Sequence, residues 1–180
     1  MTNLNRAEAP PIGYLMEIRR FEEGDEQGVI AVILAIQREE FGIAITVDGQ
    51  PDLLAIPSFY QSGNGDFWVA EKDGEIIGTI GLKDIGRDQA ALRKMFVAAP
   101  FRGRPYGVAD ALLQRLLATA RDRGISAVFL GTTDKFLAAH RFYEKNGFSE
   151  IAKDTLPDSF PLMAVDTKFY VVHLPRAASP

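Results

Sequence analysis

The sequence contains no cysteine, and this absence excludes disulfides, thiolate catalysis and thiolate metal sites. Its only histidines are His140 and His173, and neither has a recognisable pattern of partner residues. A zinc site is therefore not expected, and neither histidine is given a role. If the chain is an enzyme, we expect it to work without a metal.

An excess of positive charge and long apolar runs are also missing. The chain has 20 Lys and Arg residues against 24 Asp and Glu residues, a formal net charge of −4. No global basic field can then hold nucleic acid or an anionic membrane, so neither partner is expected. No apolar run approaches the roughly 18 residues of a membrane helix, and residues 1–11 lack the apolar segment of a signal peptide. We expect a soluble, cytoplasmic protein.

The length suits one domain with one core. Residues 1–13 are polar, contain a Pro-Pro pair and show no periodicity, so we expect a flexible N-terminal tail. Residues 175–180 are expected to form a polar C-terminal tail. Between them, residues 14–174 are expected to fold as a single domain.

The first part of this domain is expected to contain a strand, a helix and a long connection. Alternating apolar residues begin at Tyr14, and Asp25 stands where it could cap the helix that follows. Residues 43–58 carry turn signals and room for one short helix, which Pro57 is expected to end.

The remaining elements alternate more clearly. Turn signals separate three β-rich runs, which predict antiparallel strands over residues 67–70, 75–82 and 90–97. A helix over residues 107–123 and a buried parallel strand over 127–130 should follow. Asp134 is expected to cap the next helix, Asn146-Gly147 to end it, and two strands to complete the order.

The stretch from residue 92 to residue 123 predicts an anion site. It combines a strand, a turn, a loop and a long amphipathic helix. Backbone N–H groups and the positive end of the helix dipole then meet at one point, beside small residues at Gly107 and Ala109. A phosphate or pyrophosphate ligand is implied.

Two motifs, in order, resemble those of the GNAT superfamily of N-acetyltransferases. The family loop Gln/Arg-x-x-Gly-x-Gly/Ala is matched by Arg104-Pro105-Tyr106-Gly107-Val108-Ala109. The family signature Ala-x-x-Phe-Tyr-Glu-Lys-x-Gly-Phe is matched by residues 139–148. The resemblance covers roughly residues 17–174. It implies an α/β (α+β) fold: a mixed, mostly antiparallel sheet of six or seven strands flanked by helices, with a splayed parallel pair at the centre.

The resemblance implies acetyl-CoA as the acyl donor, with no metal. The loop is expected to bind its pyrophosphate, and the end of the preceding strand, with a bulge near Val97, its pantetheine arm. The implied contacts are Met95, Phe96, Val97, Arg102, Arg104, Pro105, Tyr106, Gly107, Val108 and Ala109. Arg102 either reaches the adenosine phosphate or is a solvated surface residue, and Pro105 removes one N–H donor.

Acetyl transfer to an amine needs a route for the amine proton and an acid for the leaving thiolate. The resemblance implies Tyr143 as that acid, and an ordinary core aromatic is the alternative interpretation. Many relatives carry a glutamate at the start of the central strand, where this chain has Gln89-Ala90-Ala91. The candidate replacements are a water chain, Glu39, Glu40, Asp84 and Asp166.

Aromatic residues gather on the expected loops and the last strand. Some should wall the acceptor pocket, and packing in the core is the alternative for at least half of them. They are Phe41, Phe59, Tyr60, Phe160, Phe169 and Tyr170.

The favoured function is therefore an acetyl-CoA-dependent N-acetyltransferase that acts on a primary amine of a small molecule or protein. A non-catalytic acyl-CoA-binding sensor or interaction module of the same fold is the alternative, motivated by the missing glutamate. A nucleotide phosphate-binding enzyme is a weaker third hypothesis, because no Gly-Lys-Ser/Thr follows the loop. The sequence leaves open the acceptor, the base and the oligomeric state, including a homodimer.

Overall fold

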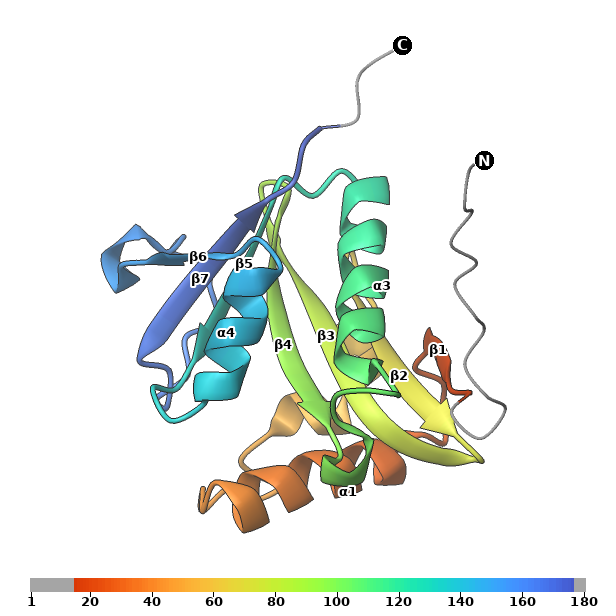
Figure 1. Ribbon diagram of the computed structural model, residues 1–180. Helices are drawn as coiled ribbons and strands as arrows, with labels where there is room; N and C mark the ends of the chain where they lie inside the picture. The colour runs from red at the N-terminus through yellow and green to blue at the C-terminus, as the bar shows by residue number, and fades with distance from the viewer. Residues whose placement is uncertain (1–14, 177–180) are drawn as a thin grey trace, which may run out of the picture.

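The computed structural model describes residues 15–176. Apart from residues 175 and 176, the two predicted tails lie outside this range. A seven-stranded mixed sheet forms the centre, in the order β1-β2-β3-β4-β5-β7-β6 (Figure 1). Its strands are β1 Glu17–Arg20, β2 Asp66–Lys72, β3 Glu75–Gly86, β4 Gln89–Val97, β5 Ala127–Thr132, β6 Ser149–Ile151 and β7 Lys168–His173. Among these strands β4 and β5 form the parallel pair, and the other neighbours are antiparallel, as the predicted fold class requires.

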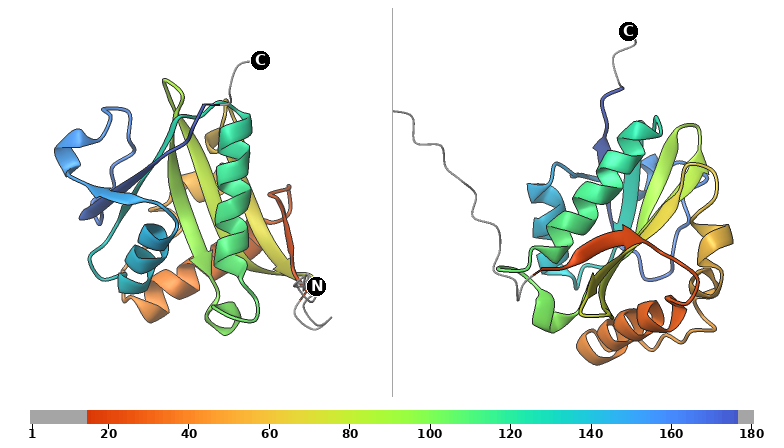
Figure 2. Two further views of the ribbon diagram at one scale, coloured as in Figure 1. Left: turned by 45° about the horizontal axis from the view of Figure 1, so that its top comes forward. Right: turned by 90° about the vertical axis from the view of Figure 1, so that its right-hand side faces the viewer.

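Helices cover both faces of the sheet. They are α1 Glu26–Ala35, the π-helical turn η2 Ile36–Glu40, η3 Pro51–Leu54, α2 Ile56–Phe59, η4 Ala99–Phe101, α3 Val108–Asp122, α4 Leu137–Lys145 and η5 Lys153–Thr155. Helices α3 and α4 lie on one face, and α1 with the short helices that follow it lies on the other (Figures 1 and 2). Strand β2 shows the alternation: Trp68 packs in the core cluster that contains residues of α3, and Phe67 packs in the cluster that contains residues of α1.

Helix α3 is anchored by its apolar stripe and by glycines at both ends. Leu112, Leu113 and Leu116 are fully buried against the sheet. Gly107 precedes the helix with φ +64°, and Gly124 follows it with φ +74°, a left-handed conformation that glycine adopts at little cost. Both ends agree with the predicted helix.

At three predicted helix ends the residue concerned does not act as expected. Asp25 is at the N-cap position of α1, but its carboxylate accepts hydrogen bonds from Arg19 at 2.7 and 2.9 Å instead of capping. Pro57 lies in the first turn of α2 rather than ending a helix, since proline has no N–H for that turn to lose. Asp134 does not cap α4, which begins at Leu137.

The parallel pair opens along its length. Strands β4 and β5 pair at three positions, from Gln89 and Ala127 to Ala91 and Phe129. Beyond that point β4 continues beside β3 and β5 continues beside β7, so the two strands diverge (Figure 1). The predicted splay is therefore present, and it leaves one edge of β4 without a strand partner.

A β-bulge sits in β4 where the strands diverge. The register with β3 shifts between the pairs Thr79–Phe96 and Gly81–Arg93, which leaves one extra residue on β4. Lys94 has φ +53° there, and its carbonyl accepts a hydrogen bond from the Thr79 hydroxyl at 2.7 Å. The bulge was expected near Val97 and lies at residues 94 and 95 instead.

Candidate functional site

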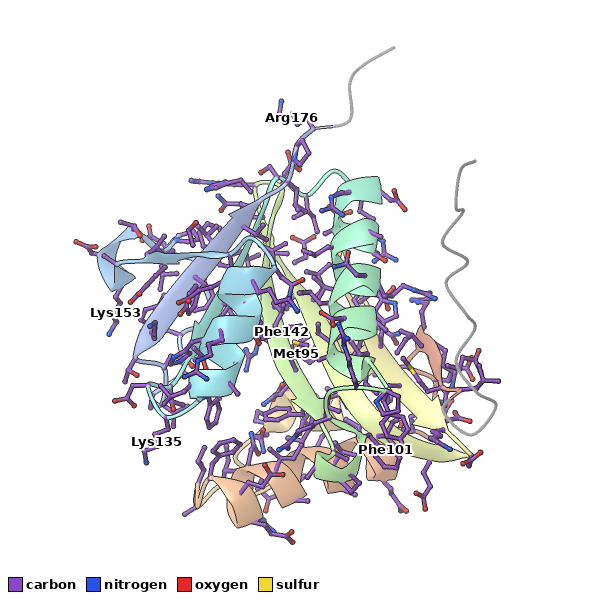
Figure 3. All side chains as sticks on the ribbon, viewed as in Figure 1. Met95, Phe101, Lys135, Phe142, Lys153 and Arg176 are labelled. Carbon is purple, nitrogen blue, oxygen red and sulfur yellow. The ribbon has the colours of Figure 1, made fainter. Side chains whose placement is uncertain are left out.

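A cavity of about 470 Å³ opens in the gap between β4 and β5. Its walls come from the second half of β4, the end of β5, the start of α4, η2 with the segment after it, and the loop at residues 160–166. Met95 of β4 lines this cavity, and both Met95 and Phe142 of α4, labelled in Figure 3, pack against the core cluster that contains Tyr143. Segments distant in the sequence thus meet where the parallel strands separate.

The loop before α3 leaves open space at the start of the helix. A Cβ atom placed on Gly107 would meet no other atom within 4 Å, and no side chain caps the helix. The N–H groups of the first helical turn have no partner within a helix, so those of Val108, Ala109 and Asp110 point out of it. The N–H of Gly107 itself donates to the carbonyl of Gly103 at 3.0 Å. The site therefore fits an anion through the helix N–H groups, and not through that of Gly107.

Other predicted loop residues differ in their placement. Arg104 and Pro105 are exposed. Tyr106 is half-buried, with its ring edge-on to Phe101 at 5.3 Å between centroids. The Val108 side chain is fully buried in the core, so only its main chain can face a ligand in the loop.

Arg102 is engaged in contacts within the chain. Its guanidinium donates to both carboxylate oxygens of Glu40 at 2.6 and 2.8 Å, and its Nε donates to the Val97 carbonyl at 2.8 Å. Arg102 is thus an exposed surface residue held in an ion pair, and its contact with an adenosine phosphate stays a prediction. The ion pair also occupies Glu40, one of the candidate bases.

The predicted strand residues all line the cavity, although their side chains diverge. Met95 packs with the core beneath α3 and α4, and the Phe96 side chain packs toward α1. Val97 is buried beneath α3 and α4. The main chain of these residues forms the unpaired edge of β4.

Tyr143 combines a core position with access to the cavity. Its ring packs edge-on against Phe148 at 5.5 Å and Phe142 at 5.6 Å between centroids. Its hydroxyl donates to the Met95 sulfur at 3.7 Å, a weak acceptor, and both residues line the cavity. Burial raises the pKa of Tyr143 far above its usual value, so the hydroxyl keeps its proton.

The structure distinguishes the candidate bases. Glu39 is exposed, and Glu40 is paired with Arg102. Asp84 accepts hydrogen bonds from the N–H groups of Asn64 and Gly86 and does not line the cavity. Of the four candidates, Asp166 is the one that lines the cavity. Among the described residues it has no ion pair shorter than 4 Å.

Asp166 is held in a specific place. Its Oδ2 accepts a hydrogen bond from the Met163 N–H at 3.1 Å, and it lies against Gly131, where an added Cβ would come within 2.6 Å of Oδ2. Burial raises the pKa of Asp166 above its usual value, and the Met163 N–H, Arg93 and Lys94 oppose that shift without cancelling it. A carboxylate with a raised pKa is a better proton acceptor than a solvated one.

A buried polar cluster that the sequence did not predict lies behind Lys94 of the cavity wall. Lys94 donates to Gln50 at 2.6 Å and lies 3.5 Å from Asp52, whose carboxylate also accepts from the Tyr60 hydroxyl at 2.6 Å. Burial lowers the pKa of Lys94, with Asp52 opposing the shift. The available signal was a pair of adjacent basic residues, Arg93 and Lys94, inside an otherwise apolar strand.

The predicted aromatic residues divide between the cavity and the core. Phe41 and Phe160 line the cavity, and the other four do not. His140 is buried with Nε2 at 2.8 Å from the Thr133 carbonyl, a structural contact. Within residues 15–176 no group of three or more His, Cys, Asp and Glu gathers as a metal site would require. In the same range no helix is long and apolar enough to span a membrane.

A mixed sheet whose parallel pair opens onto a cavity, beside a helix N-terminus open to an anion, is the architecture of an acetyltransferase fold. The chain matches the model of the acetyltransferase (GNAT) family over residues 30–148, and it belongs to that family. This confirms the predicted family and fold.

Individual relatives support the same family and fold. A GNAT-family acetyltransferase from Staphylococcus aureus Mu50 is 38% identical with a TM-score of 0.85, and the match covers 89% of this chain and 100% of that one. An N-acetylaspartate synthetase from Danio rerio is 37% identical over 111 residues, 59% of this chain and 39% of that protein. A PaiA N-acetyltransferase from Thermoplasma acidophilum, solved with coenzyme A, shares the fold at 21% identity and a TM-score of 0.66, covering 89% of this chain and 99% of that one. The chain spans 32 to 59% of the length of the curated relatives it matches.

Proposed function

We propose that the protein transfers an acetyl group from acetyl-CoA directly to a primary amine of a small molecule or protein. The observation that carries this proposal is the cavity between β4 and β5, which has Tyr143 and Asp166 on its walls. Its volume of about 470 Å³ is within the range of small-molecule sites, which favours a small acceptor. The relative named for N-acetylaspartate synthesis supports the same choice.

The residues present fit acetyl-CoA. The N–H groups of Val108, Ala109 and Asp110 face the open space beside Gly107, where a pyrophosphate would be bound. The unpaired edge of β4 over residues 95–97 offers main-chain groups to an extended pantetheine arm, apart from the Val97 carbonyl, which accepts from Arg102. When bound, acetyl-CoA supplies a thioester that the amine attacks, forming the N–C bond and breaking the C–S bond.

The residues of the cavity then handle the protons. Asp166 accepts a proton from the incoming ammonium and passes it to water, which leaves the neutral amine. The Tyr143 hydroxyl donates to the leaving sulfur and regains its proton from the acylated nitrogen. The position of both residues on the cavity wall supports these roles. Burial keeps Tyr143 protonated, so that a proton is present to donate, and makes Asp166 a better proton acceptor than a solvated carboxylate.

A non-catalytic acyl-CoA sensor remains the second candidate. Ala90 and Ala91 are fully buried at the start of β4, so no carboxylate is available at the position where the family resemblance leads us to expect glutamate. Titration of acetyl-CoA, run alongside CoA release with a panel of amines, separates the two functions. Turnover with at least one amine is expected, whereas tight binding without turnover on any amine favours the sensor.

A further inference from the structure

The cavity wall holds an arginine whose charge is poorly matched by the protein. The Arg93 side chain is 14% exposed and lines the cavity. One of its terminal nitrogens donates to the Met163 sulfur at 3.2 Å, and its guanidinium lies 5.6 Å from the centre of the Phe59 ring. Its nearest carboxylate oxygen among the described residues, in Asp52, is 4.0 Å away. A guanidinium has several N–H donors, and a thioether satisfies one of them weakly.

Asp52 is committed to other partners. It accepts the Tyr60 hydroxyl at 2.6 Å and lies closer to the Lys94 ammonium, at 3.5 Å, than to Arg93. Lys94 is held further by Gln50, whose amide exchanges hydrogen bonds with Gln37 at 3.0 and 3.2 Å. Lys94 is therefore a satisfied part of the wall, while the donors of Arg93 remain available to a ligand.

The bulge in β4 produces this arrangement. Successive side chains of a regular strand point to opposite faces, yet Arg93 and Lys94 both approach Asp52. The positive φ of Lys94 turns the chain so that two cations share one face. A strained, bulged backbone that places a cation in a cavity is typical of a binding site rather than of a packing solution.

The second carboxylate near these cations is Asp166. Arg93 and Asp166 both contact Met163, the arginine through its sulfur at 3.2 Å and the carboxylate through its N–H at 3.1 Å, and both line the cavity together with Lys94. The wall thus presents a cation whose carboxylate contact is long and, near it, a second carboxylate. The complementary ligand carries a negative group and an amine close together.

We propose that the acceptor is a small aminocarboxylate, whose carboxylate binds Arg93 while its amine lies against Asp166. This inference rests on the proposed acetyl transfer and names the substrate class of the same site. A guanidinium matches a carboxylate through paired N–H···O bonds, and a charge-assisted pair in a partly buried site discriminates strongly against an uncharged analogue. Arg93 is then the specificity-determining residue of the cavity.

Matched acceptors test the proposal. CoA release is measured with L-aspartate, L-glutamate and β-alanine, each beside its carboxamide forms, which keep the shape and lose the charge. The acids are expected to show a kcat/KM roughly 10- to 100-fold above that of the amides. Equal kcat/KM values for acids and amides would overturn the inference while leaving the acetyl transfer intact.

Variants assign the preference to its residue. Arg93→Gln is expected to raise KM for the acids until acid and amide are used equally. Arg93→Lys should keep part of the preference, because lysine retains the positive charge but lacks the paired N–H donors of a guanidinium. Arg121→Gln, an exposed arginine at the end of α3, is the matched control and should keep the wild-type preference. A preference that survives Arg93→Gln contradicts the assignment.

A binding measurement keeps the inference testable without turnover. Calorimetry of the CoA-bound protein with N-acetyl-L-aspartate and N-acetyl-L-asparagine amide should show tighter binding of the acid, lost in Arg93→Gln. If no amine is acetylated, the transferase proposal fails and this titration alone decides the anion site. Equal binding of both probes by the wild-type protein would overturn it.

Discussion

Replacing Tyr143 by phenylalanine removes one oxygen atom from the cavity and little else. The ring contacts with Phe142 and Phe148 stay, and the lost hydroxyl has the Met95 sulfur, at 3.7 Å, as its acceptor. A weak hydrogen bond of this kind contributes about 1 kcal/mol or less, so we expect a change in Tm of at most about 4 °C. Because the pyrophosphate site lies at α3, the Kd for acetyl-CoA should stay the same.

Turnover should fall steeply in the same variant. A positioned proton donor contributes roughly 100- to 10,000-fold, and kcat for Tyr143→Phe is expected to drop within that range. Release of CoA can be followed with a thiol reagent, since the chain has no cysteine to react with it. Tyr170→Phe is the matched control: its hydroxyl donates to Glu144 at 2.9 Å, away from the cavity, and kcat should be unchanged.

The pH dependence sharpens this prediction. Burial raises the pKa of Tyr143 above its usual value of about 10, so the hydroxyl stays protonated at every lower pH. Tyr143 should therefore give no alkaline loss of activity below about pH 10. A Tyr143→Phe variant with wild-type kcat across the pH range would remove this residue from the mechanism.

The other predictions concern the base, the loop and the paired arginine. Asp166 must be ionised to accept a proton and burial raises its pKa, so kcat/KM should fall as the pH drops through that raised pKa. Asp166→Asn should lower kcat roughly 100-fold and remove this acidic limb of the pH profile. An acidic limb that persists in the variant would point to another group. Gly107→Val should weaken acetyl-CoA binding more than tenfold in a titration. Gly124→Val, with a similar φ of +74° at the other end of α3, is the control and should lower stability alone. Equal affinities of the two variants for acetyl-CoA would refute the loop site. Glu40→Gln should tighten acetyl-CoA binding by up to about fivefold at low salt if Arg102 moves to a phosphate, and unchanged affinity would show that Arg102 has no such role.

Much of the fold follows from local signals in the sequence. Asp73-Gly74 between two β-rich runs forms the β2–β3 hairpin, and the helix predicted over residues 107–123 is α3. These signals act over a few residues, so the sequence contains them directly. The divergence of β4 and β5 was expected from the family resemblance, and no residue pattern in either strand states it.

Two expectations that failed depend on contacts that form only in the folded chain. Asp25 has the sequence context of a helix cap, but Arg19 of β1 lies close enough to bind its carboxylate, an ion pair that the folded sheet creates. The bulge at Lys94 likewise depends on the register between β3 and β4. Local preference was outweighed by tertiary contacts in both places.

The candidate site was only partly predictable for the same reason. The family motif identifies Tyr143, but the side of the molecule that each carboxylate faces depends on the path of its loop. Asp166 reaches the cavity because residues 160–166 fold back beside Gly131. Arg93 and Lys94 form the proposed anion-binding wall only because Gln50 and Asp52 pack behind them. Gln50 and Asp52 precede their partners by more than forty positions in the chain.

The central claim is direct transfer of an acetyl group to an amine in the cavity between β4 and β5. Mass spectrometry after incubation with acetyl-CoA and an amino acid acceptor tests it most directly, because it weighs the acceptor and the protein in the same reaction. We predict that the acceptor gains one acetyl group for each CoA released and that the mass of the protein stays unchanged. Saturable binding of acetyl-CoA with no acetylated product, for acceptors across the whole amine panel, would contradict the claim.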